Sequence, residues 1–184
     1  MAVAERDGIR TRARILEVAQ ELFTERGYAG TSIADIAREL GTSKAALYYH
    51  FSSKEQLLGA LLAEPLSGYA DLADRCRAEH LGPADVLGAL IDLTAETHTV
   101  FALLSNDPSI TPLLQRLHDV EGSIQTFVEL LAGPNPAEAM RAKAWAAFAV
   151  AKQGTFWAVQ AGDGTLSAVA RKALLAAAVR CLKS

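Results

Sequence analysis

The sequence is poor in cysteine, in aromatic residues and in strand-forming patterns, and each shortage excludes a class of protein. Its two cysteines, Cys76 and Cys181, lie far apart and form no CxxC pair, so no disulfide framework is predicted. Aromatic residues make up only 7% of the chain, and β-branched residues are few beside Ala and Leu. We therefore expect an all-α protein in a reducing compartment, the cytoplasm.

Long hydrophobic runs are also missing. The most apolar segments, residues 144–161 and 165–182, are broken by charged residues such as Lys152 and Arg171, so no membrane span is expected. Residues 1–14 are polar and contain no apolar core of a signal peptide. With 51% hydrophobic and 21% charged residues, the chain has the composition of a globular protein.

No arrangement of residues indicates catalysis. No Ser or Cys stands in a nucleophile-elbow context, and no glycine-rich phosphate loop follows a strand. The histidines lack HxxxH or HExxH spacing, and no carboxylate joins them at the spacing of metal ligands; they are His50, His80, His98 and His118. We predict no catalytic residue, no metal and no cofactor, and hence no enzyme.

Apolar residues of the first segment recur with the period of a helix. They form one face of a helix that should end at Gly27, because glycine tolerates a positive φ. The members of this face are Ile15, Val18, Ala19, Leu22 and Phe23.

Serines precede the next three predicted helices. Ser32 precedes a short helix that ends at Gly41, with Asp35 three residues on in a capping-box position. Ser43 precedes a third helix that reaches residue 50, and Ser53 precedes a fourth. Because the turns between these helices are very short, the first three must pack against one another.

Proline and glycine divide the rest of the chain into longer helices. Pro65 should kink or interrupt the fourth helix near its middle. Further breaks are predicted where Gly and Pro cluster. The expected helices lie near 83–104, 112–132, 136–161 and 165–183.

The second and third helices have the spacing of a helix-turn-helix motif. Ala37 permits a close helix crossing, Gly41 permits the tight turn, and Leu47 fills the shared core. With the surrounding residues, this segment resembles the DNA-binding domain of the tetracycline-repressor (TetR) family of bacterial transcription regulators. The matching residues are Ile15-Leu16, Ala19, Leu22-Phe23, Gly27-Tyr28, Thr31-Ser32-Ile33, Ile36-Ala37, Gly41, Ser43-Lys44, Leu47-Tyr48-Tyr49-His50-Phe51 and Lys54-Glu55-Gln56-Leu57-Leu58.

The resemblance implies a two-part all-α protein. An N-terminal three-helix helix-turn-helix domain, residues 1–52, would bind DNA, and a C-terminal helical bundle, residues 53–184, would bind a ligand and dimerise. A homodimer would place its recognition helices in successive major grooves of a palindromic double-stranded operator, with half-sites about 34–36 Å apart. A small effector would shift the spacing of the DNA-binding heads, usually releasing DNA. The alanine-rich last two helices suit a four-helix dimer interface, or alternatively the core of a monomer.

Candidate DNA contacts lie on the third helix and at the helix starts around it. Groove contacts are expected from the exposed face of that helix, namely from Lys44, Ala45, Ala46 and Tyr49. The family match and the helix starts point to phosphate contacts at Thr31, Ser32, Ser43, Tyr48, His50 and Lys54. For three of these residues the alternative to a phosphate contact is a structural role. These roles are packing for Tyr48, a favourable position at the helix C-terminus for His50 and helix capping alone for Ser43. The arginines 10, 12 and 14 suit either an N-terminal DNA arm or a solvated face.

The effector pocket is harder to place. We expect a largely apolar small molecule in the C-terminal bundle, lined by His98, Phe101, Trp145, Phe148 and Gln153. Ordinary core packing is the alternative for each of these residues.

Charge leaves two functions open. Residues 1–56 hold eight Lys and Arg residues against eight Asp and Glu residues, so DNA binding must depend on where charges lie rather than on their sum. The first hypothesis is a ligand-responsive repressor. The second is a helical protein that binds a small molecule or a partner and has lost DNA recognition.

Overall fold

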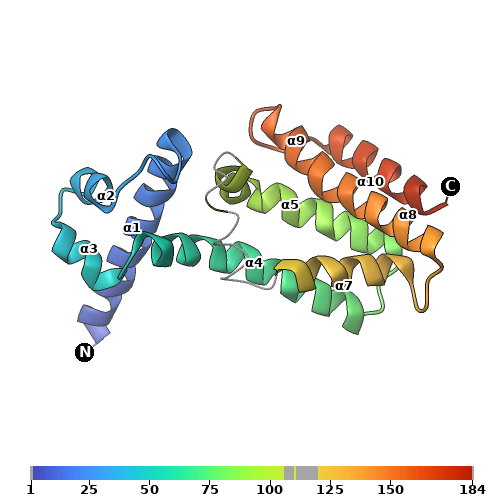
Figure 1. The fold of residues 1–184 in the computed structure, drawn as a ribbon, viewed down its shortest axis with the longest axis horizontal. Coiled ribbons are helices and arrows are strands. Elements are labelled where there is room, and N and C mark those ends of the chain that lie inside the picture. The colour runs from blue at the N-terminus through green and yellow to red at the C-terminus, as the bar shows by residue number, and fades with distance from the viewer. Residues whose placement is uncertain (1, 106–109, 111–119, 184) are drawn as a thin grey trace. The chain divides into compact units, whose positions relative to one another are not determined.

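The computed structural model describes residues 2–105, 110 and 120–183, and these form helices joined by short connections (Figure 1). Within those ranges there is no strand, which confirms the predicted all-α fold. None of the described helices combines the length and hydropathy of a membrane span. The chain divides into two compact units: an N-terminal unit, residues 1–64 and 100–118, and a C-terminal unit, residues 65–99 and 119–184.

The N-terminal unit contains α1 (Ala2–Arg26), α2 (Ile33–Glu39), α3 (Lys44–His50) and the first part of α4 (Lys54–Ala78). Helix α2 packs against both α1 and α3. The predicted apolar face of α1 is entirely buried, and it meets buried residues of the other helices; these are Ile33, Ile36, Ala37, Leu47, Leu57 and Leu58. The first three helices therefore share one core, as their short turns require.

Helix α4 continues through Pro65 from Lys54 to Ala78. Of the two predicted outcomes, a kink or an interruption, the interruption is therefore wrong, and the kink stays a prediction. A proline inside a helix removes one backbone hydrogen bond and typically costs about 3 kcal/mol. However, α4 buries large side chains on both sides of the proline, including Leu62 and Leu66. Most helical stability in proteins comes from such packing, so the helix persists.

The C-terminal unit continues with the rest of α4 and with α5 (Pro83–Ser105) as far as residue 99; the end of α5 belongs to the N-terminal unit. It also contains α7 (Val120–Ala132), α8 (Glu138–Ala149), the π-helical turn η2 (Val150–Gly154), α9 (Thr155–Gln160) and α10 (Ala168–Lys183). Helix α8 packs against α7 and α10, and α10 also packs against η2 and α9. The predicted helix 112–132 is described only from residue 120; residues 112–119 and the predicted break at 107–109 lie outside the described residues.

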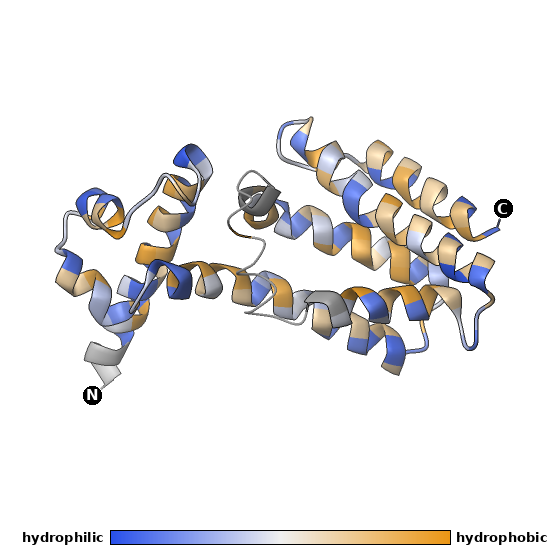
Figure 2. Cartoon of the chain, in the orientation of Figure 1, coloured by the Kyte–Doolittle hydropathy of each residue, from blue (hydrophilic) through white to orange (hydrophobic). Residues whose placement is uncertain are grey.

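The predicted helix 136–161 contains a π-helical turn that its sequence pattern did not indicate. Helices α8, η2 and α9 follow one another without a break from residue 138 to residue 160. Gly154 ends the turn, and a Cβ added there would lie 2.8 Å from Leu174 Cδ2 of α10. The glycine thus permits α10 to pack closely on η2. In Figure 2, α10 is coloured mostly towards the hydrophobic end of the scale, with a few hydrophilic residues between.

Candidate nucleic-acid interface

Helix α3 divides sharply into a buried and an exposed face. Leu47 and, just after the helix, Phe51 are fully buried, while Tyr48 is 50% exposed and Tyr49 is 86% exposed. Their position follows from the helical period, because neighbouring residues of a helix point in different directions. Tyrosine is enriched at interfaces because its ring is apolar and its hydroxyl polar, so two adjacent exposed tyrosines are candidates for contact with a partner.

A side-chain cap begins α3 and a glycine turn precedes it. The Ser43 hydroxyl accepts a hydrogen bond from the backbone N–H of Ala46 at 3.1 Å. Gly41 has φ +63°, and the N–H of the next residue, Thr42, donates to the carbonyl of Ala37 at 2.9 Å. The turn therefore closes α2 and starts α3 within four residues, as predicted from the Ala-Gly-Leu spacing.

Helix α2 begins with the predicted capping box. The Ser32 hydroxyl accepts from the backbone N–H of Asp35 at 3.2 Å, and Asp35 Oδ2 accepts from the backbone N–H of Ser32 at 3.0 Å. The Ser32 hydroxyl also donates to Asp35 Oδ2. This side-chain hydrogen bond, followed by the one from the Ser32 backbone N–H, lowers the pKa of Asp35 to about 2, and Arg38 adds to the effect. Ser32 is exposed beside this capped helix start.

Thr31 was expected to contact a phosphate from the start of α2, but the structure places it in the interior. Its side chain is buried, and Oγ1 lies 3.1 Å from the carbonyl of Leu22 and 2.9 Å from that of Gly27. A hydroxyl has one proton to donate, and here it serves the end of α1. The Thr31 side chain therefore connects α1 to α2, and we leave it out of the proposed DNA contacts.

Lys54 joins the start of α4 to the connection between α1 and α2. Its Nζ donates to the carbonyl of Tyr28 at 2.8 Å and to the carbonyl of Thr31 at 3.0 Å. The same Nζ lies 4.1 Å from the centroid of the Tyr28 ring. Two of the three ammonium donors thus hold the N-terminal unit together. If Lys54 contacts a phosphate, it does so through the third N–H of its ammonium group.

Ser53 caps α4 in the predicted manner, with one difference. Its hydroxyl accepts from the backbone N–H of Gln56 at 3.1 Å. The Gln56 side chain accepts from the N–H of Ser52 at 2.6 Å, one residue before the position that a capping box uses.

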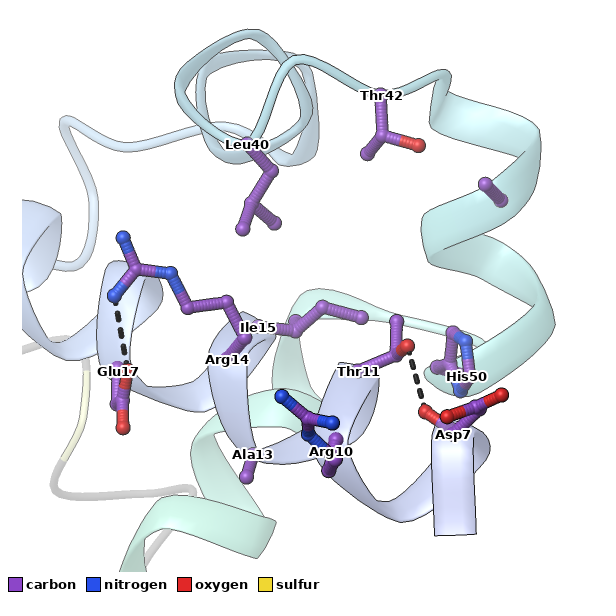
Figure 3. Close-up of a pocket in the computed structure, with 11 residues that line it drawn as sticks. Asp7, Arg10, Thr11, Ala13, Arg14, Ile15, Glu17, Leu40, Thr42 and His50 are labelled. Atoms are coloured by element: carbon purple, nitrogen blue, oxygen red, sulfur yellow. Dashed lines mark hydrogen bonds and ion pairs between the residues drawn. The ribbon is translucent and has the colours of Figure 1, made fainter. Parts of the chain in front are cut away.

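A groove of about 740 Å³ lies between α1 and the α2–α3 turn. Figure 3 shows α1 residues such as Arg10 and Arg14 on one side and Leu40, Thr42 and His50 on the other. Leu40, which follows α2, is only partly buried and lines this groove. The groove thus brings exposed arginines of α1 close to α3.

Arg10, Arg12 and Arg14 of α1 have different surroundings. Arg14 pairs with Glu17 at 3.0 Å on the exposed surface (Figure 3), and the Arg12 guanidinium lies 4.7 Å from the centroid of the Phe51 ring. Arg10 lines the groove. Arg14 therefore lies on a solvated face, and the Arg12 side chain is placed by its contact with the Phe51 ring.

Among the five predicted effector residues, Trp145 and Phe148 contact each other. Phe148 is buried, stacks on Phe127 at 6.2 Å between centroids and meets Trp145 edge-on. Trp145 is 44% exposed, and Gln153 is exposed as well. His98 and Phe101 are partly buried. The contact of Trp145 with Phe148 is thus the one described between members of the predicted set.

Sequence reasoning missed two residues of the C-terminal unit that lie together. Lys152 Nζ lies 4.4 Å from the centroid of the buried Tyr69 ring. A signal was present, because Lys152 is the single charged residue in the apolar segment 144–161. Among the described residues, no group of three His, Cys, Asp or Glu side chains is placed to hold a metal ion.

The fold and the capped α2–α3 pair define a helix-turn-helix protein. Residues 15–61 match the family model of bacterial regulatory proteins, tetR family. The N-terminal segment of this chain is therefore similar to regulators of the tetR family.

Individual proteins agree with this assignment. The chain is 34% identical over 104 residues to the HTH-type transcriptional regulator TtgR of Pseudomonas putida, a match that covers 56% of this chain and 49% of TtgR. It is 48% identical over 44 residues to the negative transcriptional regulator IcaR of the Staphylococcus aureus biofilm operon, or 24% of each chain. The chain thus spans about half the length, or less, of these curated relatives.

Solved structures extend the likeness beyond the helix-turn-helix. The TetR family transcriptional regulator PfmR of Thermus thermophilus superposes with a TM-score of 0.69, at 25% identity, over 93% of this chain and 98% of PfmR. The predicted architecture, an N-terminal helix-turn-helix with a C-terminal helical domain, is therefore confirmed.

Proposed function

We propose that this protein is a ligand-responsive transcriptional repressor that binds a palindromic operator as a homodimer in the cytoplasm, and that it is not an enzyme. Residues 1–52 would bind DNA, and residues 53–184 would bind the effector and dimerise. The observation that carries the proposal is the exposed face of α3, where Tyr49 is 86% exposed beside a fully buried Leu47. The negative regulator IcaR, matched within the same segment, supports repression.

The proposed groove contacts come from one face of α3. Lys44, Ala45, Ala46 and Tyr49 are all exposed there. Lys44 can donate to guanine or to a phosphate, and the alanines offer apolar contact to a thymine methyl. Phosphate contacts are assigned to Ser32, Ser43, Tyr48, His50 and the remaining donor of Lys54. Such contacts set the register of the protein on DNA, while the groove contacts select the sequence.

Dimerisation is supported by apolar side chains left exposed on the last helices of the C-terminal unit. Trp157 of α9 is 59% exposed and Val169 of α10 is 81% exposed. Exposed alanines accompany them, among them Ala146, Ala149, Ala173 and Ala176. Small side chains permit close packing of helices from two subunits. Because one seven-residue α3 offers few DNA contacts, two copies on a palindrome are the expected form.

The test is binding of the purified protein to a duplex from its own promoter region and to a scrambled duplex of the same composition, at several salt concentrations. We expect preference for the promoter duplex and an affinity that falls steeply with salt. Lys44→Ala and Tyr49→Ala should each weaken promoter binding about 10-fold or more. Arg75→Ala, on the exposed surface of α4, is the matched control and should bind as the unaltered protein does.

Two outcomes would contradict the proposal. A dimer that binds both duplexes equally would favour the second hypothesis, a partner-binding or small-molecule-binding protein without DNA recognition. Equal effects of Arg75→Ala and Lys44→Ala would show that only general charge matters. Lys54→Ala is a poor probe of DNA contact, because its loss would also release the carbonyls of Tyr28 and Thr31.

A further inference from the structure

Helix α3 carries Ala45 and Tyr49 on the side that faces away from its buried residue. An α-helix turns by about 100° per residue, so the residues two places before and after Leu47 lie nearly opposite it. Leu47 is fully buried, while Tyr49 is 86% exposed and Ala45 is exposed as well. Ala45 and Tyr49 therefore form the outermost strip of α3.

The other residues of α3 proposed to contact DNA lie on its two flanks. Ala46 and His50 line the groove between α1 and the α2–α3 turn, where Figure 3 labels His50. Lys44 and Tyr48, one helical turn apart, lie on the opposite flank, and both are exposed. A duplex that meets the outermost strip thus presents its base edges to the side chains between these flanks.

Ala45 offers such a base edge a methyl group and no hydrogen bond. Its side chain has neither a donor nor an acceptor, so it cannot distinguish the polar groups of the bases. In the major groove, the group that makes a favourable apolar contact with alanine is the methyl group at C5 of thymine. Ala45 is therefore suited to recognise a methyl group rather than a pattern of hydrogen bonds.

Aromatic side chains surround the exposed Ala45 methyl group. Tyr48 and Tyr49 follow Ala45 by three and four residues, and residues at these spacings are neighbours on a helix surface. The Tyr49 ring meets the His50 ring edge-on, at 5.2 Å between centroids, so it is held towards one flank, and Ala45 stays exposed. A methyl group of DNA that contacts Ala45 thus also lies near aromatic rings. Removing one methyl group from water in this way increases affinity about 4-fold.

We propose that Ala45 recognises the C5 methyl group of one pyrimidine in each operator half-site, and that 5-methylcytosine is accepted there in place of thymine. The two bases carry the same methyl group and differ at C4, where thymine has a carbonyl oxygen and cytosine an amino group. Ala45 has no polar atom that distinguishes them. Methylation of a cytosine at this position therefore increases the affinity of the protein for DNA. This inference rests on the proposed function and names the group on the operator that α3 recognises.

The experiment begins with selection of a preferred duplex from a random pool by the full-length protein. Each thymine of a half-site is then replaced in turn by uracil, which lacks only the methyl group. We expect uracil at one position to weaken binding about 4-fold, and at the same position of both half-sites about 16-fold. Cytosine and 5-methylcytosine at that position, each paired with guanine, should differ by the same factors. Fluorescence anisotropy at a fixed salt concentration measures the affinities.

Glycine variants assign the methyl preference to one residue. Ala45→Gly removes the methyl group on the protein, so the preference for thymine over uracil at one position should fall from about 4-fold to less than about 2-fold. Ala46→Gly is the matched control: it has a similar cost in helix propensity but lies on the flank that lines the groove, and should keep the preference. Ala45→Ser, which retains the side-chain size but adds a polar hydroxyl, should also reduce it. Circular dichroism checks that each variant is folded.

Three outcomes would overturn this inference and leave the proposed function intact. They are a selected duplex that no uracil substitution weakens, 5-methylcytosine that binds no better than cytosine at the sensitive position, and a methyl preference that Ala45→Gly retains in full. A selection that enriches no duplex would overturn the proposed function, and this inference with it.

Discussion

The two compact units differ in how uniformly their helices are capped. In the N-terminal unit, the short helices α2 and α3 both begin at a serine whose side chain accepts a backbone hydrogen bond. In the C-terminal unit, Ser167 caps α10 in the same way, but α8 begins at Ala137 with no side-chain cap. Long-range polar contacts occur in both units: those of Lys54 in the N-terminal unit, and the bidentate pair of Arg171 with Asp92, with both N–O distances 2.5 Å, in the C-terminal unit.

This difference matches the proposed division of labour. A surface that reads DNA must keep its shape, and local caps define each short helix independently of distant residues. A ligand-responsive unit needs contacts between helices that a small molecule can change, and contacts such as Lys152 with Tyr69 are of that kind. Three predictions test the contrast, beginning with the largest expected effect.

Leu47→Ala should have the largest effect on the N-terminal unit. Leu47 is fully buried between the short helices, and truncation of such a leucine typically costs about 2–5 kcal/mol. Urea denaturation followed by circular dichroism measures the change. Tyr49→Ala, on the same helix but 86% exposed, should change the free energy of unfolding by less than about 0.5 kcal/mol. Equal losses in the two variants would mean that α3 lacks the two-faced character described above.

Lys152 should make the stability of the C-terminal unit depend on alkaline pH. Its pKa is about 8 in the folded chain, against an ordinary value of 10.5. Below pH 8 both folded and unfolded chains hold the proton, and the folded chain bears the full cost of the buried charge. As the pH rises from 8 to 10.5 the folded chain loses the proton first, so the free energy of unfolding rises, by up to about 3 kcal/mol.

The rise is measured as the difference between the unaltered protein and Lys152→Met, by urea denaturation at several pH values from 7 to 10.5. Other groups that titrate in this range cancel in the difference. We expect Lys152→Met to be the more stable protein at pH 7 and the two to converge near pH 10.5. A difference that does not change with pH would show that Lys152 keeps an ordinary pKa.

Removing the cap of α3 and adding one to α8 should have the smallest effect on stability. These changes test the comparison between the two units most directly. Ser43→Ala removes the cap of α3 and should destabilise the N-terminal unit by about 1 kcal/mol. Ala137→Ser adds a cap where the backbone is already extended, at φ −60° and ψ 156°, and should stabilise α8 by about the same amount. Melting temperatures of both variants measure these changes. If Ala137→Ser had no effect, the start of α8 would be determined by packing alone.

The sequence predicted well those features that depend on near neighbours. The caps at Ser32, Ser43 and Ser53 and the turn at Gly41 are confirmed, because each involves residues no more than four or five positions apart. The buried face of α1 is also confirmed, since helical periodicity determines it. The DNA contacts of α3 stay predictions, although the structure does expose the residues proposed to make them.

Features that depend on distant residues were not predicted. The persistence of α4 through Pro65 depends on buried side chains on both sides of the proline. The exposure of Trp145 and Gln153 could not be derived, because an alanine-rich helix lacks a clear apolar face. The π-helical turn that carries Lys152 was missed because a helical pattern assumes the same period throughout.

The sequence by itself determined where the short N-terminal helices begin and end and which side of α3 is buried, since these depend on hydrogen bonds and periodicity within a few residues. Only the tertiary structure decided what the polar groups contact. It buried Thr31, used two donors of Lys54 to hold the connection between α1 and α2, and brought Lys152 against Tyr69. Those contacts join residues far apart in the chain, and their energy depends on burial, which no local pattern specifies.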